Sequence, residues 1–160
     1  MQFYDVVLWI HITAVMTALG PAFAYAAIAA IAAKEGLRAS LGVERAIFKL
    51  NMTGTTYGMV VILLSGLYVA GDRWSFGDFF VSWGVIAILV LFGIVHGYFL
   101  PRQRRLIAGL EAEADAAAGD AKVERSGELR TLDREIERMG IVAGIVIVLT
   151  IYVMTAKPFL

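Results

Sequence analysis

Four stretches of the 160-residue chain are almost continuously apolar. About 20 apolar residues cross the hydrocarbon core of a bilayer as a helix, so each stretch is long enough to span a membrane. We predict membrane helices over residues 4–33, 49–70, 80–100 and 139–156. The first exceeds the required length and is expected to tilt or to kink near Gly20-Pro21, and Pro101 is expected to end the third.

The segment between the third and fourth stretches, residues 102–138, is charged, alanine-rich and nearly free of helix-breaking residues. We predict a cytoplasmic helical hairpin here, broken near Gly119-Asp120, that continues the flanking membrane helices. Mixed charges at helical spacing are typical of a solvated face, and a platform for docking another protein is the alternative. One apolar face leads into the fourth membrane helix through Leu129, Leu132, Ile136 and Met139.

The basic residues are unevenly distributed between the loops. Segments 34–49 and 102–138 hold twelve of the 14 lysines and arginines, and only Arg73 and Lys157 lie elsewhere. The positive-inside rule then places both charged segments in the cytoplasm and both termini outside, as expected for a multi-pass protein of a bacterial cytoplasmic (inner) membrane. The first residues carry no positive charge, so we do not expect a cleaved signal peptide.

The composition agrees with an all-α, polytopic four-helix membrane bundle that forms a single domain. The chain is 59% hydrophobic and carries no net charge, which gives no reason to expect a nucleic-acid partner. It has no cysteine, which excludes disulfides, thiolate zinc sites, iron–sulfur clusters and covalently attached haem. Membrane lipid is the expected surrounding.

Small residues recur every four positions in each apolar stretch. Such spacing lets membrane helices approach closely, so it predicts a tight bundle, and some of these faces could join copies of the chain into a homo-oligomer or bind a larger complex. The small residues are Ala14, Ala18, Ala22, Ala26 and Ala30, followed by the pairs Gly54 and Gly58, Gly93 and Gly97, and Gly140 and Gly144.

Both histidines of the chain, His11 and His96, lie inside apolar stretches. An ionisable residue in a membrane span suggests a functional site. Imidazole there can ligate haem, relay protons or form a hydrogen bond between helices. At ~1.5 Å per residue the two histidines differ by ~15 Å in depth, so they are not expected to bind one haem together. Lys157 shares the leaflet of His11 and is the easier partner, although its spacing alone favours an ordinary interfacial anchor.

The second apolar stretch is polar near its basic end, where Asn51, Thr53, Thr55, Thr56 and Tyr57 cluster. These residues could line a cavity for a porphyrin, a quinone or a small solute, or they could form hydrogen bonds between helices. No acidic residue lies deep in a span, which argues against an ion-coupled transporter.

Several short motifs resemble those of one known family. They are Trp9-Ile10-His11-Ile12, Glu44-Arg45, Ser65-Gly66-Leu67-Tyr68, His96-Gly97-Tyr98 and the closing Lys157-Pro158-Phe159. In order and spacing the chain is similar to the HemJ family of haem-containing protoporphyrinogen IX oxidases. It departs from them at residues 133–138 and in its long charged loop, which look more like a related family of predicted integral membrane proteins with no established activity.

The HemJ resemblance implies that His11 and Lys157 are the catalytic and haem-binding residues, with His11 as the ligand of the iron. We expect His96, Asn51 and Tyr57 to contribute to cofactor binding. The implied function is a membrane redox protein with haem b that oxidises a porphyrinogen-like substrate and passes electrons to quinone. The alternative is a non-enzymatic subunit or assembly partner of a larger membrane complex, with structural histidines.

Overall fold

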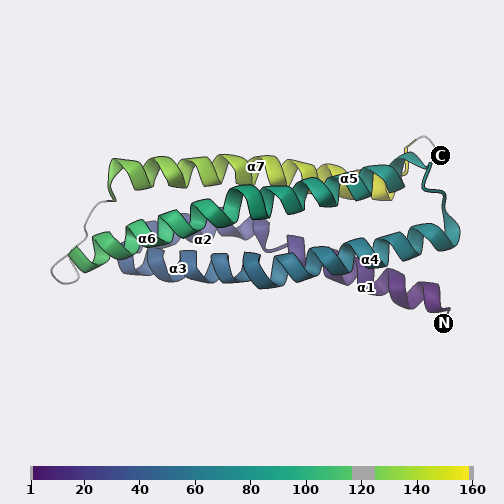
Figure 1. Ribbon diagram of the computed structural model, residues 1–160, viewed down its shortest axis with the longest axis horizontal. Helices are drawn as coiled ribbons and strands as arrows, with labels where there is room; N and C mark the ends of the chain where they lie inside the picture. The colour runs from purple at the N-terminus through teal and green to yellow at the C-terminus, as the bar shows by residue number, and fades with distance from the viewer. Residues whose placement is uncertain (1, 117–124, 159–160) are drawn as a thin grey trace.

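The computed structural model describes residues 2–116 and 125–158 (Figure 1). Within these residues, four helices are long and apolar enough to cross a membrane: Phe3–Glu35, Leu37–Arg73, Phe79–Ala116 and Gly127–Ala156. They run along the long axis of the molecule, and both termini lie at the same end (Figure 1). We call this the terminal end, and we call the opposite end, which holds the turn at Gly36, the charged end. The predicted all-α architecture is therefore confirmed, and the four long apolar helices are consistent with a four-span membrane bundle.

The first long helix is interrupted where the sequence predicts a kink. Helix α1 covers Phe3–Leu19 and α2 covers Ala22–Glu35. Pro21 has no N–H to continue the hydrogen-bond ladder of α1, and its ring clashes with the preceding turn. The break lets α1 pack on α4 while α2 packs on α3, before the chain reverses at Gly36 with φ of 119°.

The second long helix extends well beyond the predicted span of 49–70. It consists of α3 (Leu37–Leu50), the π-helical segment η1 (Asn51–Thr55) and α4 (Thr56–Arg73). These 37 residues measure ~55 Å, against a bilayer core of about 30 Å. The charges of α3 (Arg38, Glu44, Arg45 and Lys49) favour a position of that part outside the hydrocarbon. Its buried face is formed by Leu37, Ser40, Glu44 and Ile47.

The expectation that Pro101 ends the third helix is wrong. The helix continues from α5 (Phe79–Gly93) through the π-helical segment η2 (Ile94–Phe99) into α6 (Leu100–Ala116). In a π-helical turn the carbonyls accept hydrogen bonds from N–H groups five residues further on. The backbone hydrogen bonds are therefore already rearranged just before Pro101, which has no N–H to donate. The wider turn thereby accommodates Pro101 inside a helix.

The fourth helix, α7 (Gly127–Ala156), ends where predicted but begins earlier than residue 139. The Ser126 hydroxyl caps its first turn by accepting a hydrogen bond from the Leu129 amide. Near the charged end α7 packs on α6 and α3 through Leu37, Leu106, Leu110 and Leu129, so the charged segment is helical on both sides. The break predicted near Gly119-Asp120 lies outside the described residues.

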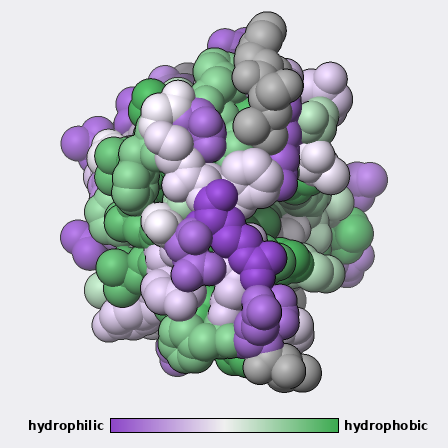
Figure 2. All heavy atoms as spheres, turned by 90° about the vertical axis from the view of Figure 1, so that its right-hand side faces the viewer, coloured by the Kyte–Doolittle hydropathy of each residue, from purple (hydrophilic) through white to green (hydrophobic). Residues whose placement is uncertain are grey.

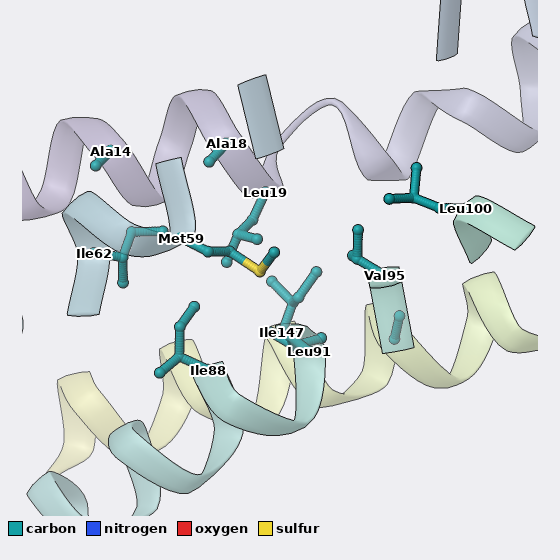
Figure 3. Close-up of a cluster of buried hydrophobic side chains, with 11 residues drawn as sticks. Ala14, Ala18, Leu19, Met59, Ile62, Ile88, Leu91, Val95, Leu100 and Ile147 are labelled. Atoms are coloured by element: carbon teal, nitrogen blue, oxygen red, sulfur yellow. The ribbon is translucent and has the colours of Figure 1, made fainter. Parts of the chain in front are cut away.

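The main core joins all four long helices through buried apolar side chains, ten of which Figure 3 labels. Met59 is at its centre, with Ala18 and Leu19 of α1 above it and Leu91 and Ile147 nearby (Figure 3). Large apolar side chains also cover the outside of the bundle, as expected of a surface that contacts lipid. At the terminal end, hydrophilic residues gather in the middle of the face (Figure 2).

The small residues follow the predicted pattern only in part. A Cβ on Gly58 would lie 2.3 Å from the Cβ of Ala18, so this glycine does allow α1 and α4 to approach closely. Gly54, Gly93, Gly97 and Gly140, in contrast, have open space where a Cβ would be. Gly93 of α5 and Gly97 of η2 are turned outward, so they form no close contact within the bundle, and a face that joins copies of the chain remains the alternative prediction for them.

Candidate binding cavity

A cavity of about 900 Å³ lies between α2, the second and third long helices and α7. Its volume is in the range of sites that bind drug-sized ligands. Many lining side chains on α2 and α7 are exposed, among them Phe23, Ile145 and Val148. The cavity therefore opens sideways between these two helices, toward the surrounding lipid.

The wall formed by α2 and α7 is largely apolar and combines small residues with large ones such as Phe23, Ile145 and Val148. Ala22, Ala26, Ala29 and Ala30 of α2 face Gly140, Ala143 and Gly144 of α7 across the opening. The four-residue stripes that predicted close packing thus border an open space here. Large side chains enter it from the same two helices, and the ring of Phe23 reaches α7, where it lies 3.6 Å from the position of a Cβ on Gly144.

The end of the cavity toward the charged end is polar. Asn51 and Thr55 of η1 and Gln103 of α6 are buried there. The Asn51 amide nitrogen donates to Gln103 Oε1 at 3.2 Å, and the Thr55 hydroxyl lies 3.3 Å from the carbonyl of Ala18. The amide nitrogen of Gln103 has no acceptor within the described residues.

Three carboxylates also border this polar end: Glu44 of α3, with Asp133 and Glu137 of α7. Glu44 is only 4% exposed and its carboxylate has no hydrogen-bond partner in the part of the chain that the structure describes. Asp133 forms an ion pair of 2.6 Å with Arg125. Burial and the neighbouring Asp133 raise the pKa of Glu44 to about 7, against a smaller opposing effect of Arg125.

Both π-helical segments border the cavity. Asn51 and Thr55 belong to η1, and Ile94, Val95 and Phe99 belong to η2. Single π-helical turns inside α-helices occur frequently at functional sites, because the extra residue in the turn changes which side chains face inward. The placement of both segments on one cavity supports its interpretation as a binding site.

His11 lies outside this cavity, between α1 and α4. Its Nδ1 is 3.0 Å from both the carbonyl oxygen of Ile62 and the hydroxyl of Ser65. Because a carbonyl can only accept, Nδ1 carries the proton and donates it. The ring packs on Gly66, where a Cβ would lie 2.9 Å from Cε1. His11 thus joins two helices, and no hydrogen-bond partner of its Nε2 lies within the described residues.

His96 has protein partners at both ring nitrogens. Nδ1 donates to the carbonyl of Phe92 at 3.0 Å, and Nε2 is 3.2 Å from the Thr56 hydroxyl. The ring also stacks on Phe92 with a centroid distance of 4.0 Å. His11 and His96 contact α4 at Ser65 and Thr56, nine residues apart, so they differ in depth by ~14 Å as expected.

Lys157 and Tyr57 do not meet His11. The Lys157 ammonium lies 3.8 Å from the centre of the Trp74 ring, in a residue with left-handed backbone conformation. Lys157 contacts Trp74 and His11 packs on Gly66, and these two contacted residues are eight positions, or ~12 Å along the helix, apart. Two nitrogen ligands of one metal ion are only about 4 Å apart, so Lys157 and His11 are too distant to share one. Tyr57 is 70% exposed and faces outward. Of the five predicted site residues, only Asn51 lines the cavity.

The sequence reasoning missed the carboxylates of the cavity and Gln103. One signal for Glu44 was available: Leu37, Ser40, Glu44 and Ile47 are spaced by three and four residues, as on one face of a helix. An acidic residue on that face predicts a buried carboxylate. Asp133 and Glu137 carried no such signal, because they occur in a segment where charged residues are frequent.

Comparisons with known proteins address the family and not the activity. A model of predicted integral membrane proteins of the family DUF2269 matches residues 5–158. Neither a curated protein nor a solved structure matches the chain. None of the comparisons supports the HemJ resemblance. The match agrees instead with the second resemblance, to a related family of predicted integral membrane proteins with no established activity. The chain therefore belongs to the DUF2269 family of predicted integral membrane proteins.

Proposed function

We propose that the protein binds an amphipathic small molecule that enters the cavity from the lipid between α2 and α7. The observation that carries this proposal is the graded lining of the cavity. Alanines and glycines border its opening, and Asn51, Gln103 and Glu44 border its polar end. Since α3 lies outside the hydrocarbon, an occupant would have its apolar body in the membrane and its polar head at the surface.

The orientation belongs to the same proposal. We assign the charged end to the cytoplasm and both termini to the outside of a bacterial cytoplasmic membrane, because twelve of the 14 basic residues lie in residues 34–49 and 102–138. Residues 102–138 would then form a cytoplasmic helical hairpin. The polar end of the cavity would face the cytoplasmic leaflet.

Photolabelling in phosphatidylcholine vesicles tests the binding proposal. A photoreactive long-chain alcohol should label peptides of α2 and α7, and an excess of dodecanol should suppress the labelling. Ala26→Trp would fill the opening and is expected to reduce labelling at least about fivefold, since a bulky ring occupies the space that a ligand needs. Ala27→Trp is the matched control, because Ala27 is exposed on the same helix and does not line the cavity. Equal labelling of the two variants would refute the proposal.

A haem-dependent redox function is the second candidate, and one contact favours it. The hydrogen bond from His11 Nδ1 to the Ile62 carbonyl fixes the tautomer that leaves Nε2 able to bind iron. Lys157 is on the Trp74 ring in this arrangement, so His11 would act without it as a second ligand. Haem b would supply electron transfer, with a porphyrinogen-like donor and quinone as acceptor.

The visible absorption spectrum of the purified protein tests the haem candidate. A stoichiometric Soret band should be lost in His11→Ala and retained in His96→Ala, since both nitrogens of His96 already have protein partners. A protein that stays colourless after haem is added overturns this candidate. A colourless protein that co-purifies with other chains would instead support a non-enzymatic subunit of a larger complex.

A further inference from the structure

Within the described residues, the cavity lining carries three carboxylates at its polar end and no lysine or arginine. Glu44, Asp133 and Glu137 border it, and Arg125 is engaged with Asp133 at 2.6 Å. The other ion pair near α3 joins Arg45 to Glu111, both of which are outside the cavity lining. If all three carboxylates are ionised, the cavity end with Arg125 has a formal charge of −2.

Glu44 is the most informative of these groups. Its side chain is buried, and no hydrogen bond within the described residues satisfies it. Those residues contain no unpaired polar side-chain atom that is fully sealed from solvent. The Glu44 oxygens therefore touch the open space of the cavity. A buried carboxylate without a partner is costly, and a partner of opposite charge would offset that cost.

A metal ion is a poor partner for this site. Within the described residues, no three His, Asp or Glu side chains are close enough together to hold a metal ion. The carboxylates are instead spread over α3 and α7 around the end of an apolar cavity. A broad organic cation attached to an apolar body fits this distribution better than a small inorganic ion does.

We propose that the cavity selects molecules with an ammonium or guanidinium head on an apolar body, and that the Glu44 carboxylate is the counter-ion of that head. This inference rests on the proposed function of the cavity. The apolar body would lie between α2 and α7, and Asp133 and Glu137 would add to the negative potential around the head. Two sources could supply such a molecule: an amine-headed membrane lipid, or a single-chain amphipathic amine that partitions from water.

Competition for photolabelling tests the proposed selectivity. The protein is reconstituted into phosphatidylglycerol vesicles, whose head group carries no ammonium, and labelled with the photoreactive alcohol in the presence of dodecyltrimethylammonium or dodecanol. After correction for partitioning into empty vesicles, the ammonium compound should compete at least about tenfold more strongly. Glu44→Gln keeps the shape of the side chain and should remove this preference without reducing competition by dodecanol. Glu111→Gln, an exposed carboxylate outside the cavity, should leave the preference unchanged.

The outcomes separate the two proposals. Equal competition by the two compounds, or an ammonium preference that persists in Glu44→Gln, would overturn the cation proposal and leave the cavity as a binding site. Labelling that neither compound suppresses would overturn both. Mass spectrometry of co-purified lipids identifies the source of the ligand. An amine-headed lipid that is enriched with the wild type and lost in Glu44→Gln indicates a lipid ligand. If no such lipid co-purifies and the wild type still prefers the ammonium compound, the ligand is a free amphipathic amine.

Discussion

At the scale of single residues, the ionisable groups in the bundle have different roles. Both ring nitrogens of His96 have hydrogen-bond partners, Phe92 and Thr56. His11 links α1 to α4 by hydrogen bonds to Ile62 and Ser65. Both agree with the structural role that a histidine among hydroxyl groups suggests. Glu44 is the exception, because it is buried and lacks a hydrogen-bond partner among the described residues. A residue that weakens the fold points to a function.

Glu44 should make the stability of the protein depend on pH. Its pKa is about 7 in the folded protein, compared with 4.5 for a free carboxyl, so the folded state binds the proton more tightly. Stability should therefore be greatest below about pH 4.5, fall as the pH rises to about 7, and level off above it. The full difference corresponds to about 3 kcal/mol. Thermal unfolding in detergent at about pH 5 and about pH 8 measures it.

Glu44→Gln should remove this dependence. At about pH 8 the variant should be more stable than the wild type by up to about 3 kcal/mol, whereas near pH 5 the two should differ little. Glu111→Gln serves as the control, since the exposed ion pair with Arg45 is expected to contribute less than about 1 kcal/mol. A Glu44→Gln variant with the pH profile of the wild type would contradict the burial of a charged Glu44.

At the scale of helices, local interruptions decide how the long helices pack. The break at Gly20–Pro21 lets the first helix contact α4 with one half and α3 with the other. The segments η1 and η2 change the side-chain register of the second and third helices beside the cavity. Helices α1 and α4 pack closely, because Gly58 and Gly66 have no side chain where Ala18 and His11 contact them.

The contact between α1 and α4 can be tested by adding one methyl group. Gly58→Ala would place a Cβ 2.3 Å from that of Ala18, so the two helices must move apart. We expect a loss of about 1–3 kcal/mol, as for other overpacked sites. Gly54→Ala is the matched control in the same long helix, because nothing lies within 4 Å of its added Cβ. Thermal unfolding in detergent measures the stability of the two variants. Equal stability of Gly58→Ala and Gly54→Ala would contradict the close approach of α1 and α4.

At the scale of the whole molecule, the two ends differ in charge and in the parts that they bring together. The terminal end combines both termini with the turn before α5 (Figure 1). The charged end combines α3, α6 and the first turns of α7, which share one small apolar core. The cavity is lined by the central parts of the long helices and has its carboxylates toward this second end, so the orientation in the membrane decides from which compartment its polar part is reached.

Cysteine labelling would determine the orientation, and the chain is suited to it because it contains no cysteine. We expect a membrane-impermeant maleimide to label Ser75→Cys in intact cells and to label Glu128→Cys only after the membrane is opened. Both positions are exposed and lie at opposite ends of the bundle. The reverse labelling pattern would place the charged end outside and invert the proposed topology.

Features that depend on local composition and on the thickness of a bilayer could be predicted without the structure. These are the four spans, the interruption at Gly20–Pro21, the end of the last helix at Ala156 and the different depths of the two histidines. Each follows from the rise of a helix, the missing N–H of proline or the length of an apolar run. The predicted helix end at Pro101 failed because η2 rearranges the hydrogen bonds that proline would otherwise break.

The residues of the candidate site, in contrast, became evident from the packing of the helices. Glu44, Gln103 and Asp133 come from three separate helices, and no spacing along the chain relates them. This packing also placed Lys157 on Trp74 and turned Tyr57 outward, although both were expected at the site. The physical reason is that the neighbours and rotation of each helix depend on packing between distant segments, whereas the sequence pattern reports only which positions along one helix share a face.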